Sequence, residues 1–326
     1  MPFTLLPENG FTKAVQTTVL PGLKPFHQSG AEETAAGVPV RWDWYGCEKP
    51  RGSILISHGF TESGFKMIEM AWYFHQMGFN VMTFDHLGHG YSRKEGADVS
   101  LTDVKAFSDY LEAVGKVDRV MRGKGDGPYF LYAHSMGGAV GALYVKAHPD
   151  AFRGAVFTSP MIRAQTAGLP IWAGGGIAQA ACLLGLGGKM VFIHKIYDPE
   201  ESFEASPATS RARFRWYSAV RQKYPRYRNN GASYRWLREA MKACGELTGK
   251  KGAEGIRIPT VFYIAEKDDI VDTGAIRTFA SKIPHARLVQ IPHSKHEIYR
   301  SGNRAMGIYL RSIESFLDEQ CESGDD

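Results

Sequence analysis

The chain alternates short apolar runs with longer segments in which apolar residues recur at helical spacing. The apolar runs predict strands over residues 52–58, 79–85, 129–134, 153–158, 260–265 and 286–291. The helical spacing predicts helices over residues 64–77, 101–122, 137–147, 273–283 and 303–319. Because strands and helices that alternate with short connections build a mostly parallel sheet covered on both faces, we expect an α/β fold.

Two segments depart from this alternation. Residues 38–45 alternate apolar and polar side chains, which predicts an antiparallel strand at an edge of the sheet. Residues 161–255 lack the strand pattern of the core and are too long for a loop. We expect them to form an inserted helical cap, or lid, over a core made of residues 1–160 and 256–326.

One strand-to-helix junction carries a serine. Ser135 follows the apolar run 129–132 and precedes a helical segment that begins with small residues. Ala133 and Gly137 let strand and helix approach closely, which permits the strained backbone that lifts a serine hydroxyl clear of the sheet. The pattern is that of a nucleophile elbow, G-x-S-x-G, with alanine in the first position. The alternative is that the serine only stabilises the turn and takes no part in catalysis.

A nucleophilic serine requires a base, a carboxylate that orients the base, and amide donors for the oxyanion. The predicted strand 260–265 is followed by Glu-Lys-Asp-Asp, and the strand 286–291 by Pro-His-Ser-Lys-His. The carboxyl ends of parallel strands meet at one edge of an open α/β sheet, where active-site groups gather. We therefore expect Ser135, Asp268 and His296 to form a catalytic triad.

The acid and the base each have rivals nearby. Asp269 and Asp272 are alternatives to Asp268, although Asp272 is better placed to cap the helix that begins at Thr273. His293 is an alternative to His296, but it directly ends its strand, whereas His296 lies past the bend and precedes an apparent helix.

The oxyanion donors are expected from two backbone positions. The apolar strand 53–57 runs into a His-Gly pair, His58 and Gly59, at the point where such folds bend a loop toward the nucleophile. We expect the N–H groups of Phe60 and Met136 to form the oxyanion hole. The alternative is a simple turn that ends the strand.

Three histidines, His58, His86 and His89, lie close to glycines in two of these loops. No cysteine or acidic ligand at zinc-like spacing accompanies them. We therefore expect neither a metal nor a cofactor.

Four motifs together resemble a known group of proteins: the segments 58–63 (HGFTES), 84–92 (FDHLGHGYS), 133–138 (AHSMGG) and 296–298 (HEI). They are similar to those of α/β-hydrolases of the monoacylglycerol lipase and bacterial lysophospholipase group, and the resemblance extends from about Val38 to Leu317. Residues 230–239 look more like the lysophospholipase branch. The resemblance implies an α/β-hydrolase fold with Ser135 as nucleophile, Asp268 as acid and His296 as base. Two positions depart from the general pattern: Ala133, which related lipases share, and the strand end at Ala265-Glu266-Lys267, where many relatives carry glycine.

The first part of the predicted cap is apolar. Residues 164–188 have no charged side chain, but they include seven glycines and Pro170, which argues against a transmembrane helix. We expect this part to form an acyl-chain channel or a lip that touches a lipid interface. The candidate residues are Leu169, Ile171, Trp172, Ile177, Leu183, Leu184 and Leu186.

The second part of the predicted cap is charged. An acidic cluster at 198–204 precedes a basic-aromatic run at 211–228. Such a run is commonly a solvated helix face, and the alternative is that its arginines attract a phosphate headgroup or an anionic membrane surface. Because no nucleic-acid-binding fold accompanies the run, nucleic acid is not an expected partner.

Composition fits a globular enzyme. The chain has 326 residues, 44% of them hydrophobic and 22% charged, with a net charge of +5 that is too small to argue for nucleic acid. Its four cysteines show no pairing or metal motif, and its start lacks the pattern of a secretory signal. We expect free thiols and a cytoplasmic protein, with peripheral contact to the inner face of the membrane as an option.

Three hypotheses follow from the sequence. The leading one is a serine hydrolase that cleaves the ester of a lysophospholipid or monoacylglycerol through an acyl-enzyme on Ser135. The second is an aminopeptidase-like enzyme, amidase or short-chain esterase of the same fold, with the acidic cluster anchoring a substrate amine. The third is a ligand-binding receptor with weak turnover.

Overall fold

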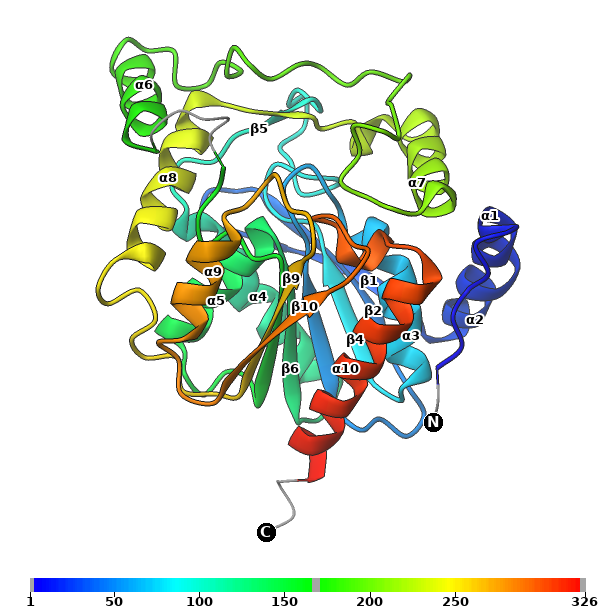
Figure 1. Cartoon of the computed structure of the whole chain (residues 1–326). Coiled ribbons are helices and arrows are strands. Elements are labelled where there is room, and N and C mark those ends of the chain that lie inside the picture. The colour runs from blue at the N-terminus through cyan, green and yellow to red at the C-terminus, as the bar shows by residue number, and fades with distance from the viewer. Residues whose placement is uncertain (1–2, 166–170, 323–326) are drawn as a thin grey trace.

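The computed structural model describes residues 3–165 and 171–322, and it contains an eight-stranded sheet (Figure 1). The strand order is β1-β2-β4-β3-β6-β7-β9-β10, in which the pairs β1–β2 and β2–β4 are antiparallel and the other neighbours are parallel. The strands are β1 (His27–Glu33), β2 (Pro39–Tyr45), β3 (Ser53–Ser57), β4 (Asn80–Phe84), β6 (Tyr129–His134), β7 (Gly154–Thr158), β9 (Thr260–Ala265) and β10 (Ala286–Ile291).

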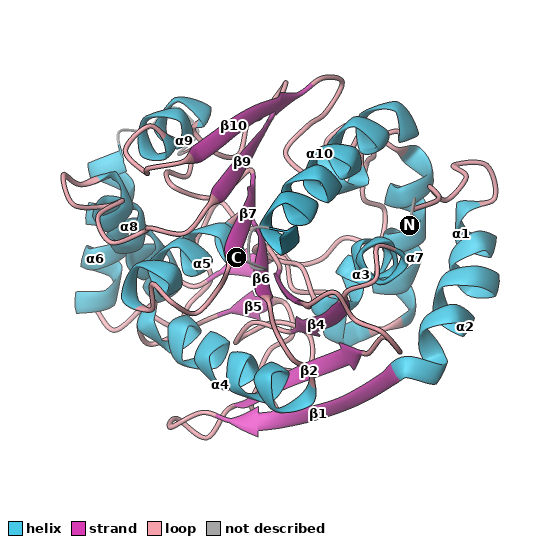
Figure 2. Ribbon diagram, turned by 90° about the horizontal axis from the view of Figure 1, so that it is seen from below, coloured by secondary structure: helices cyan, strands magenta, loops and turns pink. Residues whose placement is uncertain are grey.

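Helices cover both faces of the sheet, as the view from below shows (Figure 2). Alternate residues of a strand face opposite sides, so the sheet contributes to two hydrophobic clusters. The first cluster includes α4 (Ser108–Lys124), α5 (Met136–Ala147) and α9 (Thr273–Ala280). The second includes α3 (Ile68–Gln76), which follows the 3₁₀ helix η3 (Gly64–Met67), and α10 (Asn303–Glu322), which follows η5 (Ile298–Arg300).

An N-terminal helical stretch packs against the second cluster. It comprises α1 (Phe11–Ala14), the π-helix η1 (Val15–Val19), α2 (Leu20–Leu23) and η2 (Lys24–Phe26). Phe11, Val15, Val19 and Leu23 are buried at a spacing of four residues, which puts them on one helix face. Neither this stretch nor β1 was expected from the sequence pattern.

Three helices lie between β7 and β9. They are α6 (Ile171–Leu183), α7 (Arg211–Lys223), which precedes η4 (Pro225–Tyr227), and α8 (Tyr234–Thr248). Figure 1 shows α6 and α7 beyond the carboxyl ends of the strands, whereas α8 runs down beside α5 and α9. Ala240, Ala243, Cys244 and Leu247 of α8 belong to the first hydrophobic cluster. This helix of the predicted cap therefore packs on the core, and the cap boundaries at 161 and 255 stay a prediction.

Two expectations about secondary structure were wrong. The strand predicted at 38–45 forms as β2, but it is not an edge, because β1 pairs along its outer side. The helix predicted from residue 101 begins at Ser108, because β5 (Leu101–Thr102) pairs with β8 (Gly231–Ala232) instead. Within the described residues, no helix has the length and apolar character that crossing a bilayer requires.

Candidate active site

The turn between β6 and α5 places Ser135 at the carboxyl edge of the sheet. Its backbone has φ 51° and ψ −118°, a conformation that residues other than glycine rarely adopt. Gly137 makes the close approach possible, because a Cβ atom there would lie 2.3 Å from the carbonyl oxygen of Ser57. The strained elbow that the sequence predicts is thus present, with a small residue where it was expected.

The structure brings Ser135, His296 and Asp268 together. Ser135 Oγ lies 2.8 Å from His296 Nε2, and His296 Nδ1 lies 2.9 Å from Asp268 Oδ2. Burial raises the pKa of the Asp268 carboxyl, but the hydrogen bond and charge of His296 and two backbone N–H groups outweigh burial and lower it. Those two N–H groups, from Ile270 and Val271, each donate to Asp268 Oδ1 over 3.0 Å. The carboxylate is thereby fixed and ready to hold the imidazole.

The rival acids and base lie elsewhere. Asp269 is exposed, and Asp272 caps α9 by accepting a hydrogen bond from the N–H of Ala275, as the sequence predicts. His293 is exposed, and its backbone N–H donates to Glu266. Among the described residues, neither the carboxyl of Asp272 nor the ring of His293 forms a hydrogen bond with Ser135 or His296.

The two backbone N–H groups predicted to form the oxyanion hole, those of Phe60 and Met136, have no intramolecular acceptor among the described residues. The loop that carries Phe60 is held on both sides. Gly59 N–H donates to Glu62 Oε2 over 2.6 Å, and Thr61 N–H, at a residue with φ 59°, donates to His89 Nε2 over 3.2 Å.

Comparison with known proteins identifies the family. The model of the family described as serine aminopeptidase, S33, matches residues 48–302. This chain belongs to that family. The "Probable lysophospholipase L2" of Haemophilus influenzae is 27% identical over 279 residues, which cover 83% of this chain and 85% of the relative. The "Monoglyceride lipase" of Mus musculus is 33% identical over 121 residues, 37% of this chain and 39% of the relative.

A solved structure has the same fold. The soluble variant of the monoglyceride lipase of Saccharomyces cerevisiae, in complex with a substrate analogue, aligns with a TM-score of 0.71 at 18% identity. The alignment covers 94% of this chain and 98% of that chain. Together with the mostly parallel sheet, this match confirms the α/β-hydrolase fold.

The histidines of the two glycine-containing loops are buried and hold backbone in place. His58 Nε2 accepts a hydrogen bond from the N–H of His86 over 2.9 Å, and His58 Nδ1 lies 2.7 Å from the carbonyl oxygen of Gly59. Burial lowers the pKa of His58 to about 4, so its ring is neutral at pH 7. Across the described residues, no group of three or more His, Cys, Asp or Glu side chains is arranged to hold a metal ion.

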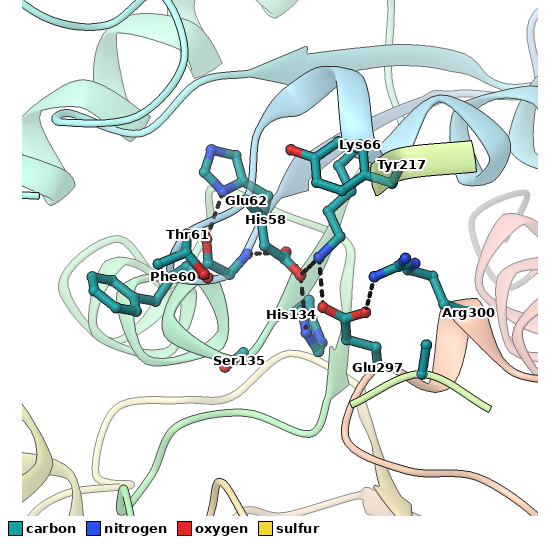
Figure 3. A network of polar contacts seen from close by, with 12 residues as sticks. His58, Phe60, Thr61, Glu62, Lys66, His134, Ser135, Tyr217, Glu297 and Arg300 are labelled. Carbon is teal, nitrogen blue, oxygen red and sulfur yellow. Dashed lines mark hydrogen bonds and ion pairs between the residues drawn. The ribbon is translucent and has the colours of Figure 1, made fainter. Parts of the chain in front are cut away.

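A buried ionic network next to the triad was not foreseen (Figure 3). Lys66 Nζ lies 2.9 Å from Glu62 Oε1 and 2.5 Å from Glu297 Oε1, and Glu297 Oε2 lies 2.5 Å from Arg300. Burial would raise the pKa of Glu62, but the Lys66 ammonium and other nearby groups hold it well below its usual range. Glu62 and Glu297 belong to the motifs 58–63 and 296–298, but no pattern in the sequence indicates Lys66 as their partner.

Most of the basic-aromatic run has intramolecular partners. Arg213 is buried and pairs with Glu69 over 2.7 Å, and Arg221 pairs with Glu201. Arg211 pairs with Glu204, and Arg228 donates to backbone carbonyls. Arg213 and Arg221 are therefore buried ion-pair residues and not part of a solvated helix face, and their pairing leaves them no free charge for a headgroup.

The structure describes the side chains of only some of the residues that were predicted to contact the substrate. Leu169 is outside the described residues, and the side chain of Trp172 in α6 is not described. Leu183 and Leu184, at the end of α6, are each 77% exposed. Such exposure does not fit the wall of an enclosed channel, whereas it is compatible with the alternative of a lip at a lipid interface.

Proposed function

We propose that this protein is a serine hydrolase that cleaves the carboxylic ester of a single-acyl lipid, a lysophospholipid or a monoacylglycerol. The observation that carries the proposal is the hydrogen-bonded chain Ser135–His296–Asp268 at the carboxyl edge of an α/β-hydrolase sheet. The relationship to a probable lysophospholipase along 83% of the chain supports the substrate class.

In the proposed mechanism, Ser135 Oγ attacks the ester carbonyl while His296 Nε2 takes its proton. The N–H groups of Phe60 and Met136 stabilise the negative oxygen of the tetrahedral intermediate, and one such donor is typically worth roughly 10²–10³ in rate. His296 then protonates the departing alcohol, and the acyl group stays on Ser135. His296 then deprotonates a water, which attacks the acyl carbonyl, and returns this proton to Ser135 Oγ as the fatty acid leaves. Asp268 keeps the imidazole in the required tautomer throughout.

In the proposal, the lipid approaches through a surface formed by the segment 183–196, which begins at the last residue of α6 and carries exposed apolar side chains. Leu183, Leu184, Phe192, Ile193 and Ile196 are between 62% and 77% exposed. Large exposed apolar side chains that gather in one segment are typical of an interaction site, and the same segment contains the exposed Lys189 and Lys195. Cations beside apolar anchors fit an anionic lipid surface. We therefore include peripheral membrane contact through this surface in the proposal; a cytoplasmic location stays a prediction.

Vesicle binding tests the membrane contact. Replacing Phe192 and Ile193 by serine should reduce co-sedimentation with vesicles that contain phosphatidylglycerol, without changing turnover of a water-soluble ester. Wild-type protein that binds neither anionic nor zwitterionic vesicles would remove this part of the proposal.

An aminopeptidase-like activity is the second candidate, because the family carries that description. In this interpretation the acidic cluster would bind the substrate amine, but Glu201 and Glu204 are already paired with Arg221 and Arg211. We therefore rank it below the lipid esterase.

A substrate panel tests the two candidates against each other. Purified full-length protein would be given monoacylglycerols and lysophospholipids of graded chain length beside aminoacyl arylamides. We expect turnover of the single-acyl lipids and little turnover of the arylamides. Hydrolysis of the arylamides alone would overturn the proposed substrate class in favour of the second candidate.

A further inference from the structure

Four charged side chains are buried together beside Ser135. Glu62, Lys66, Glu297 and Arg300 each expose 7% or less, and their charges sum to zero. Taking charges out of water is costly, and well-packed apolar residues in place of a buried ion pair are often equally or more stable. Stability is therefore a weak reason for this network, and its position suggests another one.

One end of the network holds the loop of the proposed oxyanion donor. Glu62 Oε2 accepts the N–H of Gly59, the residue before Phe60, and Glu62 Oε1 accepts the hydroxyl of Tyr299 over 2.5 Å. A Cβ atom at Gly59 would lie 3.0 Å from Glu62 Oε2, so the carboxylate rests directly against the loop backbone. Glu62 therefore holds this loop from the Gly59 side, as His89 holds it from the Thr61 side.

The other end holds the segment of the proposed base. Glu297 directly follows His296, and its N–H donates to the carbonyl of Pro207. Its carboxylate is shared between Lys66 and Arg300. The Lys66 ammonium thus joins a residue of the oxyanion loop to the neighbour of the base (Figure 3).

Besides Lys66, the basic group that the described residues place within 4 Å of Glu62 is the His134 ring, whose Nε2 lies 3.6 Å from Glu62 Oε1. Burial lowers the pKa of His134 to about 4, so at pH 7 this ring is neutral and does not replace the ammonium. Tyr217 of α7 covers the ammonium, with its ring centre 5.1 Å from Lys66 Nζ and its hydroxyl 3.2 Å from Ser63 Oγ. Without the ammonium, the carboxylates of Glu62 and Glu297 would face each other across a buried space. Their repulsion would turn Glu62 away from Gly59 or force it to take up a proton.

We propose that Lys66 is a positioning residue, whose ammonium sets the distance between the oxyanion loop and the base by binding Glu62 and Glu297 at once. The inference rests on the proposed function insofar as Ser135, His296 and Phe60 carry out ester chemistry. Because the stabilised charge develops only in the transition state, losing this alignment should lower kcat and leave KM nearly unchanged.

The test compares Lys66→Met, Lys66→Arg and wild type on a p-nitrophenyl ester, with the inhibition constant of an alkyl trifluoromethyl ketone as a second readout. This ketone forms a tetrahedral adduct on serine, so its affinity reports oxyanion alignment. For Lys66→Met we expect kcat to fall about 10- to 100-fold with KM within about 2-fold, and the inhibition constant to rise in parallel. Lys66→Arg should recover most of the loss.

A matched control removes a lysine from an ion pair of the same length elsewhere. Lys146→Met breaks the exposed pair with Glu246, also 2.9 Å long, and should change neither kcat nor the inhibition constant. If Lys66→Met does not fold, Glu297→Gln makes the same comparison while the pair of Lys66 and Glu62 remains.

Folded Lys66→Met, or Glu297→Gln in its place, with wild-type kcat and wild-type ketone affinity would overturn the inference. The soluble ester separates this result from a failure of the proposed function. Wild-type protein that hydrolyses the p-nitrophenyl ester but no single-acyl lipid would contradict the substrate class alone.

Discussion

At the scale of single residues, the carboxylate of Asp268 is held by backbone on one side and by the base on the other. It accepts two backbone N–H groups through Oδ1 and faces His296 Nδ1 through Oδ2. Its neighbour Asp269 is exposed. The two adjacent aspartates therefore provide a variant and its control.

Asp268→Asn should keep the fold and lower kcat by roughly 10³–10⁴. The amide oxygen of the asparagine would accept the two N–H groups, and its NH₂ would donate to His296 Nδ1. The neutral imidazole would then be protonated at Nε2, so that this nitrogen could not accept the proton of Ser135. Steady-state kinetics on a soluble ester measure the effect, and Asp269→Asn should behave as wild type. A larger loss of kcat in Asp269→Asn than in Asp268→Asn would show that Asp269, and not Asp268, is the acid of the triad.

Residue types and strand ends were enough to predict that Ser135, Asp268 and His296 lie together, because parallel strands bring their carboxyl ends to one edge. Glu62, Lys66 and Glu297 could not be predicted in the same way. Lys66 Nζ reaches Glu297 across 231 positions of the sequence, and the pairing depends on how η3 and the segment after β10 pack. No local pattern contains that information.

At the scale of elements, the contact of α5 with the end of β3 fixes the elbow. A Cβ atom at Gly137 would lie 2.3 Å and 2.4 Å from the carbonyl oxygens of Ser57 and His58. Both are backbone atoms, so neither can move aside without shifting β3. The helix and the strand therefore approach as closely as their backbones permit.

Gly137→Ala should destabilise the protein by about 3 kcal/mol or more, because overpacking against backbone cannot relax. Gly123→Ala is the matched control: Gly123 lies in the exposed part of α4 with no atom within 4 Å of a Cβ, and alanine there should stabilise by about 0.5–1 kcal/mol. Urea unfolding of both variants measures the difference. Equal stability of the two would contradict the close approach.

Short strands with a strong apolar signal were the elements that the sequence predicted best. The strands β6, β9 and β10 begin and end at the expected residues, because each is an apolar run bounded by turn residues. In contrast, β1 has the sequence HQSGAEE and an exposed edge, so it lacks an apolar signal. It forms because β2 offers a free side for pairing.

At the scale of the whole molecule, buried neutral histidines link stability to pH. Burial lowers the pKa of both His58 and His134 to about 4, from an ordinary value of 6.5. Burial also lowers the pKa values of His86 and His89 well below that value. Asp85 acts in the opposite direction, because burial raises its pKa to about 6.

The free energy of unfolding should therefore fall as the pH drops from about 6.5 toward 4. In this window the unfolded chain binds protons on these histidines and the folded protein does not, which favours the unfolded state. His58 and His134 should each lower the free energy of unfolding by about 2 kcal/mol at pH 5 relative to pH 7.5. The stabilisation that Asp85 contributes at pH 5 is smaller than the sum of these two losses. Urea titrations at the two pH values measure the change, and equal or higher stability at pH 5 would contradict it.

The most direct test of the account is the turnover of a lysophospholipid and a monoacylglycerol by wild-type protein and by Ser135→Ala. We predict that the alanine variant folds normally, since within the described residues the Ser135 hydroxyl forms a hydrogen bond only with the His296 ring. Its kcat should be lower by roughly 10⁴–10⁶ on both substrates. A purified, folded Ser135→Ala protein that still cleaves either lipid near the wild-type rate would contradict the central claim.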